Sequence, residues 1–414
     1  MAEPRILMLS PNLKDWTCPA LYYEQQAILN ALPGSVIYGP GFQYNTNYVP
    51  DIIREIFGND KPDFLLCYVN ERRLLGEPLD DCIVRKYNLQ GEMRIFPLGL
   101  DKVNVPKIAW INDFWGCSPQ EWDRILLGNG FQFALATCCP PFTREAVFLR
   151  FFSQQVRSTV RFIPWPRAMS PIIYRDYGLE KVYDVTLLGA LHPEGFYPLR
   201  NRMHRVFAAQ SELRYFYQQH PGYRYTGCEN ALVGDRYARV INQSRIFATC
   251  TSVYRIPIMK VYEALACRSL LLSNAPCGAE FLGLVDGDTF AAVDEHNFLA
   301  KARWYLANPD ELARVSSNGM HLFQTRHTVD KRAEEFREIL SSLLEGREPG
   351  SYAALFTREQ AVALDRSASW WEIRRVPIPS KMVNRSSYTR AVRRILSGLK
   401  KRLLKLGRVL QARD

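Results

Sequence analysis

The sequence predicts an α/β protein made of two parallel-sheet domains. At 414 residues the chain is too long for one ordinary hydrophobic core. Short apolar runs alternate with helical patterns, and most runs are apolar throughout, as in strands covered on both faces of a sheet. The alternation stops at one proline-broken segment and then restarts. Two such sheets facing each other would bind ligands in a cleft at the carboxyl ends of their strands.

The first predicted domain comprises residues 1–165, with helical patterns at Val49–Phe57 and Pro119–Leu127. Its predicted strands are short apolar runs at Arg5–Ser10, Ser35–Tyr38, Asp63–Val69, Lys107–Ile111 and Phe131–Thr137. The segment Val160–Pro171 contains three prolines and no helical period, so we interpret it as the linker between the domains.

The second predicted domain comprises residues 172–345, where the same alternation returns. Its predicted strands are Asp184–Gly189, Tyr223–Thr226, Arg245–Cys250, Ser269–Ser273 and Thr289–Val293. Its predicted helices are one from about Pro198, Asp235–Ser244, one from Pro257, Glu295–Ala307 and Pro309–Thr325. Residues 346–380 include the pair Trp370–Trp371, and we expect this segment to pack back onto the first domain.

The helix from Pro257 carries the pair of residues on which the functional interpretation depends. Its apolar stripe consists of Ile258, Val261 and Leu265. Lys260 and Glu263, three residues apart, are therefore expected on the face away from the core. A surface pair contributing about 0.2–0.5 kcal/mol is one interpretation. The other is a nucleotide-sugar site, because a carboxylate accepts hydrogen bonds from ribose hydroxyls and an ammonium neutralises a diphosphate.

Several segments resemble the spore-protein (CgeB-like) glycosyltransferases, relatives of the family-four retaining enzymes with the GT-B fold. In chain order they are DVTLLGA from Asp184, YPLRNRM, Asn242–Gln243–Ser244–Arg245, KVYEALACRSLLLSNAP from Lys260, AEFL and HTVDKR. WINDFW and IPWP in the first half are similar to that group too, but less specific. The resemblance covers roughly residues 105–335. It implies two Rossmann-like domains facing across a cleft, with a nucleotide-sugar donor held mainly by the second.

The resemblance also implies roles for individual residues. Glu263 matches the second acid of an E-x7-E pattern, which usually holds the donor ribose, and Gly189 matches a glycine that lets backbone approach the phosphates. Lys260 and Arg255 lie where cations are tolerated near the diphosphate. The other donor-binding candidates are His192, Arg200, Tyr262, Pro276 and Gly278. Arg255, Lys260 and Arg200 are candidates for stabilising the leaving group, with ordinary surface cations as the alternative.

Two residues depart from the pattern of the family. Arg255 stands where the first acid of E-x7-E would contact the transferred sugar. Arg268 stands where a glycine usually follows ALAC, so a turn normally given to glycine must be made by a bulkier residue.

The candidates for proton transfer are few. Asp113 follows a predicted strand and faces the presumed cleft, where it could bind the acceptor or remove its proton; a turn or N-cap aspartate is the alternative. All six histidines lie from His192 onward, which excludes an inverting mechanism with a histidine base in the first domain. Asp286–Gly287–Asp288 spells a DxD motif, but its surroundings indicate an ordinary turn. We expect no metal and no cofactor, because the nucleotide-diphosphate sugar is a co-substrate.

The chain is expected in a reducing cytoplasm. Its ten cysteines show neither CxxC nor Cys/His metal spacing, which indicates free thiols. The first residues lack the layout of a signal peptide, and no apolar run approaches the ~18–20 residues that cross a bilayer.

The positive charge is concentrated at the C-terminal end. Residues 381–414 contain eleven basic side chains and one acid, so they carry ten of the eleven net positive charges. Between Tyr388 and Leu410, apolar residues recur in steps of three and four with Arg and Lys between them. Such an amphipathic helix suits an anionic membrane surface, contacted through residues 388–412. A partner-docking helix, a disordered end and nucleic-acid binding are the alternatives.

These observations predict a cytoplasmic glycosyltransferase, peripheral to the inner face of the membrane. It would move a sugar from a nucleotide-sugar to a glycan, lipid-linked or protein acceptor, with retention and without a metal. One alternative is a non-catalytic GT-B-like binding or scaffold protein, suggested by Arg255. Another is a sugar transferase acting on modified DNA, although the nearly neutral body makes nucleic acid an unfavoured partner.

Overall fold

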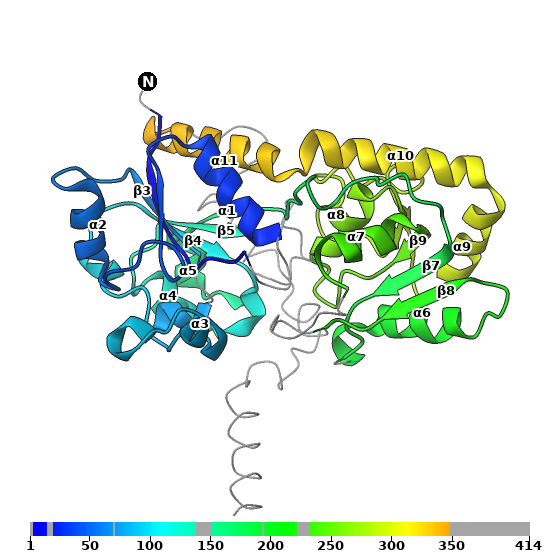
Figure 1. The fold of residues 1–414 in the computed structure, drawn as a ribbon, viewed down its shortest axis with the longest axis horizontal. Coiled ribbons are helices and arrows are strands. Elements are labelled where there is room, and N and C mark those ends of the chain that lie inside the picture. The colour runs from blue at the N-terminus through cyan, green and yellow to red at the C-terminus, as the bar shows by residue number, and fades with distance from the viewer. Residues whose placement is uncertain are drawn as a thin grey trace, which may run out of the picture.

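The computed structural model describes residues 3–14, 20–68, 71–137, 151–192, 194–221 and 232–347. These residues form two α/β units that lie side by side, each built on one parallel sheet (Figure 1). The predicted fold class is therefore confirmed. The predicted strand Tyr223–Thr226, residues 348–380 and the basic tail 381–414 lie outside the described residues.

The first sheet has six parallel strands in the order β2-β1-β3-β4-β5-β6. They are β1 (Ile6–Leu9), β2 (Val36–Tyr38), β3 (Phe64–Cys67), β4 (Lys107–Ile111), β5 (Phe133–Ala136) and β6 (Arg161–Pro164). The last strand corrects the linker predicted at Val160–Pro171, because its first residues pair with β5. Pro164 is tolerated there because β6 is the edge strand and needs no second partner.

Helices cover both faces of the first sheet. One face packs against α1 (Ala20–Ala31) and α11 (Val329–Leu344), and the other against α2 (Val49–Phe57), α3 (Asp81–Lys86), α4 (Pro119–Leu126) and α5 (Gln154–Thr159). Successive side chains of β1 alternate between these cores, Ile6 with the first group and Leu7 with the second. Burial on both faces explains why the strands are apolar throughout.

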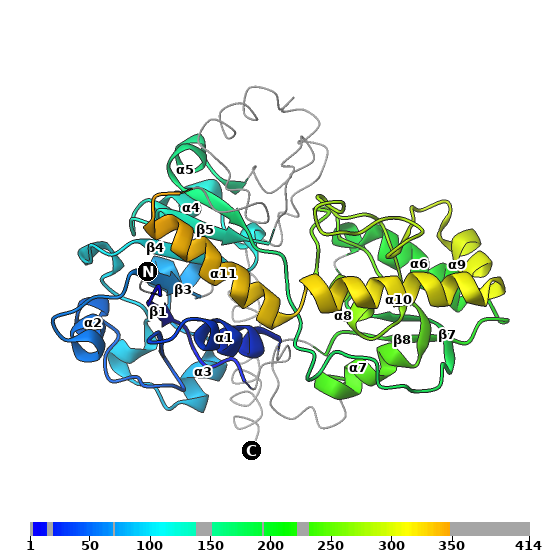
Figure 2. The same ribbon diagram turned by 90° about the horizontal axis from the view of Figure 1, so that it is seen from above.

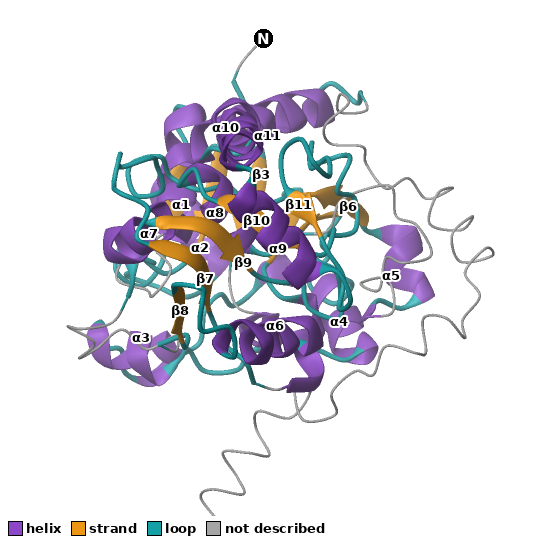
Figure 3. Cartoon of the chain, turned by 90° about the vertical axis from the view of Figure 1, so that its right-hand side faces the viewer, coloured by secondary structure: helices purple, strands orange, loops and turns teal. Residues whose placement is uncertain are grey.

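The second sheet has five parallel strands in the order β11-β10-β9-β7-β8. They are β7 (Tyr183–Leu188), β8 (Tyr215–Gln218), β9 (Ser244–Ala248), β10 (Leu270–Ser273) and β11 (Ala291–Ala292). One face packs against α6 (Pro198–Ala208) and α9 (Phe298–Ala307), the other against α7 (Gly234–Asn242), α8 (Met259–Ala266) and α10 (Pro309–Arg326) (Figure 3). The strand order reverses between β7 and β9, which makes their carboxyl ends the expected ligand site.

The chain returns to the first unit through α11 (Figures 1 and 2). This helix follows α10, lies across the first sheet beside α1, and buries Phe336 and Leu340 in the first core. The predicted domain bounds instead place α11 in the second domain, 172–345, and assign the return to residues 346–380. The two connections between the units run together, because Met169 bridges to Thr328 in parallel.

Two further properties of the described residues concern the expected compartment. None of the described helices has the length and apolar character needed to span a membrane. Cys67, Cys82, Cys250 and Cys267 are free thiols, as predicted for these residues.

Candidate active site

Arg200 lies at the point where the strand order of the second sheet reverses. Its Nη1 donates to the carbonyl oxygen of Ala190, 2.9 Å away, just beyond β7. Its Nη2 donates to Thr249 Oγ1 and to the carbonyl oxygen of Cys250, both at 3.3 Å, just beyond β9. One guanidinium that is 2% exposed therefore ties together the two loops that flank the reversal, while its Nε has no hydrogen-bond partner.

Gly189 lies between Arg200 and Lys260. It adopts a φ of +144°, and a Cβ at this position would come within 2.8 Å of Lys260 Cε and 3.5 Å of Arg200 Nη1. A residue with a side chain would have to displace the lysine. Because Gly189 has no side chain, Lys260 and Arg200 can both lie close to the carboxyl end of β7.

Glu263 does not lie on an exposed helix face, which corrects the expectation from sequence. Its residue surface is 5% exposed, because α7 packs over this side of α8. Glu263 Oε2 accepts a hydrogen bond of 2.7 Å from the Tyr237 hydroxyl, and Lys260 Nζ donates one of 2.9 Å to the same hydroxyl. Lys260 Nζ lies 4.0 Å from Glu263 Oε2. The Tyr237 hydroxyl thus links Lys260 to Glu263, and the lysine side chain lies next to Gly189.

His220 is a member of this cluster that the sequence analysis missed. It lies two residues beyond β8, and burial, together with the charges of Lys260 and Arg200, lowers its pKa to about 4. The imidazole is therefore neutral at pH 7 beside two cations. His192, which was predicted instead, is exposed. No spacing in the sequence links His220 to Lys260, forty residues away; only the sheet topology brings them together.

The other donor-binding candidates lie around the loops after β9 and β10. Arg255 has a φ of +50°, and its Nε and Nη2 donate to the carbonyl oxygen of Ala275 at 3.3 and 3.2 Å. This bond ties the β9 loop to the loop that contains Pro276 and Gly278. Of the three cations predicted to stabilise the leaving group, Lys260 and Arg200 lie on either side of Gly189. The guanidinium of Arg255 instead bonds the loop after β10. Tyr262 is fully buried in the core of the second unit, where its ring packs against His327.

The second departure from the family pattern behaves as predicted. Arg268 adopts a φ of +51°, in the region that favours glycine, and ends the turn between α8 and β10. Its guanidinium pairs with Asp176 at 3.2 Å.

Asp113 lies where the first unit meets the second. The next residues, Phe114 and Trp115, pack against Tyr254 of the second unit with ring centroids 6.0 and 5.6 Å apart. Burial raises the pKa of the Tyr197 hydroxyl, and the negative charge of Asp113 adds to that rise. Asp113 precedes a short 3₁₀ helix, yet its side chain does not cap it. The carboxylate therefore faces the same region as Arg200, whose guanidinium lies 4.0 Å from the Tyr197 ring.

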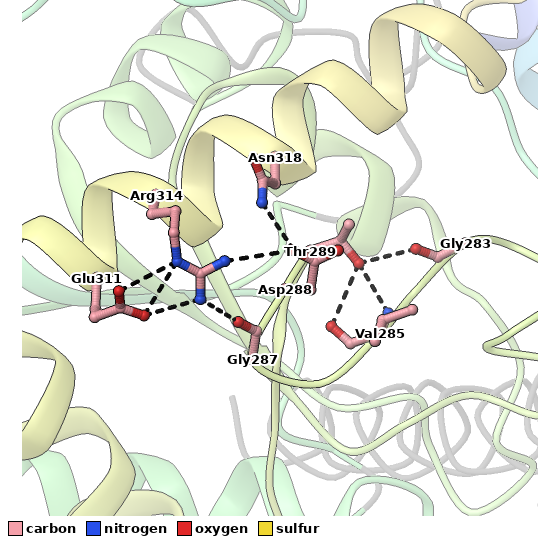
Figure 4. A network of polar contacts seen from close by, with 8 residues as sticks. All are labelled: Gly283, Val285, Gly287, Asp288, Thr289, Glu311, Arg314 and Asn318. Carbon is pink, nitrogen blue, oxygen red and sulfur yellow. Dashed lines mark hydrogen bonds and ion pairs between the residues drawn. The ribbon is translucent and has the colours of Figure 1, made fainter.

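The DxD sequence forms a turn, as predicted (Figure 4). Gly287 has a φ of +73°, and its N–H donates to the Phe290 carbonyl oxygen. Asp288 accepts hydrogen bonds from Arg314 and from Asn318, the latter at 2.8 Å. Asp286 pairs with Lys301 at 2.8 Å. Across the described residues, no group of three or more His, Cys, Asp and Glu side chains could hold a metal ion.

Comparisons with known proteins show which family and which folds this chain resembles. The sequence profile of the glycosyl transferase-like family matches residues 196–338, which contain Arg200, Lys260 and Glu263. Sucrose-phosphate synthase from Thermosynechococcus elongatus has a similar fold, with a TM-score of 0.50 and 12% identity over 83% of this chain and 100% of that one. Residues 196–338 thus match a glycosyl transferase-like family, and the chain as a whole shares the fold of this synthase.

Other solved structures resemble this protein at similarly low identity. An alpha-glucosyltransferase in complex with UDP and a 13-mer DNA has a TM-score of 0.50 and 9% identity over 82% of this chain and 100% of that one. Anabaena HepE, solved with UDP and glucose, has a TM-score of 0.47 and 11% identity over 82% and 100%. No curated protein sequence matches the chain. At 9% identity, the likeness to the alpha-glucosyltransferase concerns the fold alone.

Proposed function

We propose that this protein is a glycosyltransferase that takes its sugar from a nucleotide-diphosphate sugar bound at the carboxyl ends of β7 and β9. The observation that carries the proposal is the cluster around Gly189. Lys260 and Arg200 flank this glycine, and the carboxylate of Glu263 lies 4.0 Å from the Lys260 ammonium. The diphosphate would lie over Lys260, and Glu263 would accept a hydrogen bond from the ribose. UDP is the first donor nucleotide to test, because two of the similar structures were solved with it.

In the proposed reaction, an acceptor hydroxyl oxygen forms a bond to the anomeric carbon of the sugar. The bond from that carbon to the diphosphate oxygen breaks, and the electron pair leaves with the diphosphate. Lys260 and Arg200 would stabilise the charge that develops there without a metal. His220, kept neutral beside them, adds an N–H donor without adding like charge.

The acceptor would enter from the first unit. Asp113 is the candidate to orient the acceptor hydroxyl or receive its proton, because it lies at the carboxyl end of β4 facing Tyr197. With no histidine in the first domain, a retaining outcome of the CgeB-like type fits best. A glycan, a lipid-linked sugar or a protein would supply the hydroxyl.

The non-catalytic alternative was suggested by Arg255 in place of an acid. The contacts of Arg255 support a structural reason for the replacement, since its guanidinium bonds the backbone of the neighbouring loop. The presence of Arg255 in place of the first acid of E-x7-E is therefore compatible with sugar transfer.

Replacement of Glu263 tests the proposal. Hydrogen bonds to a charged group contribute about 1.5–3 kcal/mol, so Glu263→Ala should lower kcat/KM for the sugar donor about tenfold to hundredfold. Glu311→Ala is the matched control, because Glu311 is a partly exposed acid of the same unit that pairs with Arg314. Donor turnover is measured as nucleoside diphosphate release with a panel of UDP-, GDP- and dTDP-sugars. Equal turnover by the parent and Glu263→Ala would overturn the ribose assignment.

The basic tail supplies the proposed location. Residues 388–412 would bind the anionic inner face of the membrane, at about 1 kcal/mol for each basic residue near the surface. That would place the transferase beside lipid-linked or surface-glycan acceptors in the cytoplasm.

A further inference from the structure

Asp113, the proposed acceptor residue, lies between two residues that accept hydrogen bonds from buried side chains. Before it, Asn112 accepts from Arg167 Nη2 at its carbonyl oxygen, 3.1 Å away, and also at its side-chain oxygen. After it, the carbonyl oxygen of Phe114 accepts from Trp122 Nε1 at 2.9 Å. Both donor residues are almost fully buried, with Arg167 5% and Trp122 0% exposed. The backbone on either side of Asp113 is therefore tied to the interior of the protein.

The register of the first sheet explains how Arg167 reaches Asn112. Ile111 pairs with Ala136, and Ala136 pairs with Pro164, so the carboxyl ends of β4, β5 and β6 are level with one another. Asn112 is the first residue after β4, and Arg167 follows the end of β6 by three residues. Because β5 lies between these two strands, the arginine side chain extends past β5 to bond the turn after β4.

In the described part of the chain, Arg167 donates hydrogen bonds to Asn112 alone. Its Nη1 is buried there without a hydrogen-bond partner. Burial raises the pKa of Glu24, on α1, to about 7, and the positive charge of Arg167 opposes that rise. A buried guanidinium with an unused donor costs free energy, so packing alone does not explain an arginine at this position. Its specific contribution is the pair of bonds to Asn112.

The turn that contains Asp113 faces the second unit on its other side. Trp115 stacks on Tyr254 of that unit, with ring centroids 5.6 Å apart and planes inclined by 30°. The negative charge of Asp113 acts on the hydroxyl of Tyr197. An aspartate side chain is short, so the backbone of the turn decides where its carboxylate lies. A shift of Asn112 would therefore move the carboxylate relative to the second unit.

We propose that Arg167 is a positioning residue, which holds Asn112 so that the Asp113 carboxylate faces the acceptor hydroxyl. Trp122 holds the other end of the same turn. A misplacement of about 1 Å can lower a rate about a hundredfold, even when the change lies away from the reacting atoms. This inference rests on the proposed function and adds to it a residue that acts through Asp113.

Replacement of Arg167 by methionine tests the inference, because it removes the guanidinium but keeps an unbranched stem in the core. The crystal structure of the variant should show the Asp113 carboxylate displaced by about 1 Å or more, and kcat should fall about a hundredfold. kcat is measured as nucleoside diphosphate release from the most active donor among UDP-, GDP- and dTDP-sugars. The affinity for UDP, measured by calorimetry, should stay within twofold of the parent, because the donor site lies in the other unit. A partly unfolded variant would instead lose UDP sites in proportion to its activity.

Two control variants separate this role from the loss of a buried charge. Lys107, at the opposite end of β4, is 4% exposed, and its Nζ donates to the Val103 carbonyl oxygen at 2.8 Å. Lys107→Met therefore removes a similarly buried cation from the same strand and should leave kcat within twofold of the parent. Glu24→Gln removes the carboxylate on which the charge of Arg167 acts but keeps the bonds to Asn112. Its kcat should also stay within twofold. All variants are melted first, and kcat is compared at a temperature where each is folded.

A milder variant tests the same contact from its other end. Asn112 is half-buried, so Asn112→Ala leaves the core unchanged. It removes the side-chain oxygen and keeps the carbonyl oxygen, so kcat should fall by a smaller factor than in Arg167→Met.

A double variant shows whether Arg167 acts through Asp113. Adding Arg167→Met to Asp113→Asn should lower kcat less than about threefold further. Equal falls in both backgrounds, or an unmoved Asp113 carboxylate in Arg167→Met, overturn the inference while leaving the donor site in place. An Asp113→Asn variant with the kcat of the parent overturns the acceptor role of Asp113. A parent that releases no nucleoside diphosphate overturns the proposed function itself.

Discussion

Replacement of Lys260 by methionine removes the ammonium but keeps an unbranched stem beside Gly189. Two unit charges about 4 Å apart interact by about 4 kcal/mol at an effective dielectric constant of about 20. Part of this attraction already acts on the bound donor before the reaction and does not lower the barrier. The loss of transition-state stabilisation should therefore resemble that on removing one preorganised hydrogen-bond donor, about 2.7–4 kcal/mol. The expected result is a fall in kcat of about a hundredfold to a thousandfold.

The same substitution has a smaller cost in stability. Without the ammonium, the Tyr237 hydroxyl loses a donor, and the buried Glu263 carboxylate loses the cation that lies 4.0 Å away. An incompletely satisfied buried group costs about 1–3 kcal/mol. Thermal melting should therefore show a modest decrease, and activity is compared at a temperature where both proteins are folded.

Lys301→Met is the control for Lys260→Met. Lys301 pairs with Asp286 at 2.8 Å in the same unit, on the turn formed by the DxD sequence. Its loss should leave kcat within twofold of the parent, measured as nucleoside diphosphate release at saturating donor and acceptor. A Lys260→Met enzyme with kcat within threefold of the parent would refute the assignment of the leaving-group site to Lys260.

Three further predictions concern the site, the fold and the tail. Gly189→Ala should displace Lys260, since the new Cβ would lie 2.8 Å from Lys260 Cε. The variant should lower kcat/KM at least tenfold and lose about 1–3 kcal/mol of stability. Full activity would contradict the close approach of Lys260 to Gly189. Burial, followed by the charge of Arg332, lowers the pKa of His327 from 6.5 to about 3 in the folded protein. Below pH 6.5 a proton therefore binds His327 in the unfolded chain but not in the folded one, and stability falls as the pH falls. Urea unfolding should show the parent losing about 2 kcal/mol relative to His327→Gln between pH 7 and pH 5, and an unchanged difference between the two would count against a neutral buried imidazole. Deletion of residues 386–414 should release the protein from anionic vesicles in a flotation assay, and equal vesicle binding by both forms would exclude the tail as the anchor.

The sequence predicted most of the fold because local patterns were strong. The strand Lys107–Ile111 and the helix Val49–Phe57 have the predicted bounds, since one is apolar throughout and the other has a clear amphipathic period. β8 was missed because Tyr215–Gln218 is a half-buried edge strand that lacks a continuous apolar run. The return of α11 was misplaced because its apolar face shows a helical period, which does not reveal the sheet against which it packs.

The site could be predicted only in part. Glu263, Lys260 and Gly189 came from the family pattern, and the structure places them together. Their burial was not predictable from α8 alone, because it depends on α7 packing over the polar side of that helix. Tyr237 and His220 lie 26 and 40 residues before their partners Glu263 and Lys260. They come near because α7 packs on α8 and because β8 lies beside β7 in the sheet.

The most direct measurement is a crystal structure of the protein with UDP bound. The diphosphate should lie beside Gly189 within about 3 Å of Lys260 Nζ, with a ribose hydroxyl bound to the Glu263 carboxylate. UDP bound away from the carboxyl ends of β7 and β9, with neither Lys260 nor Glu263 in contact, would contradict the proposed donor site.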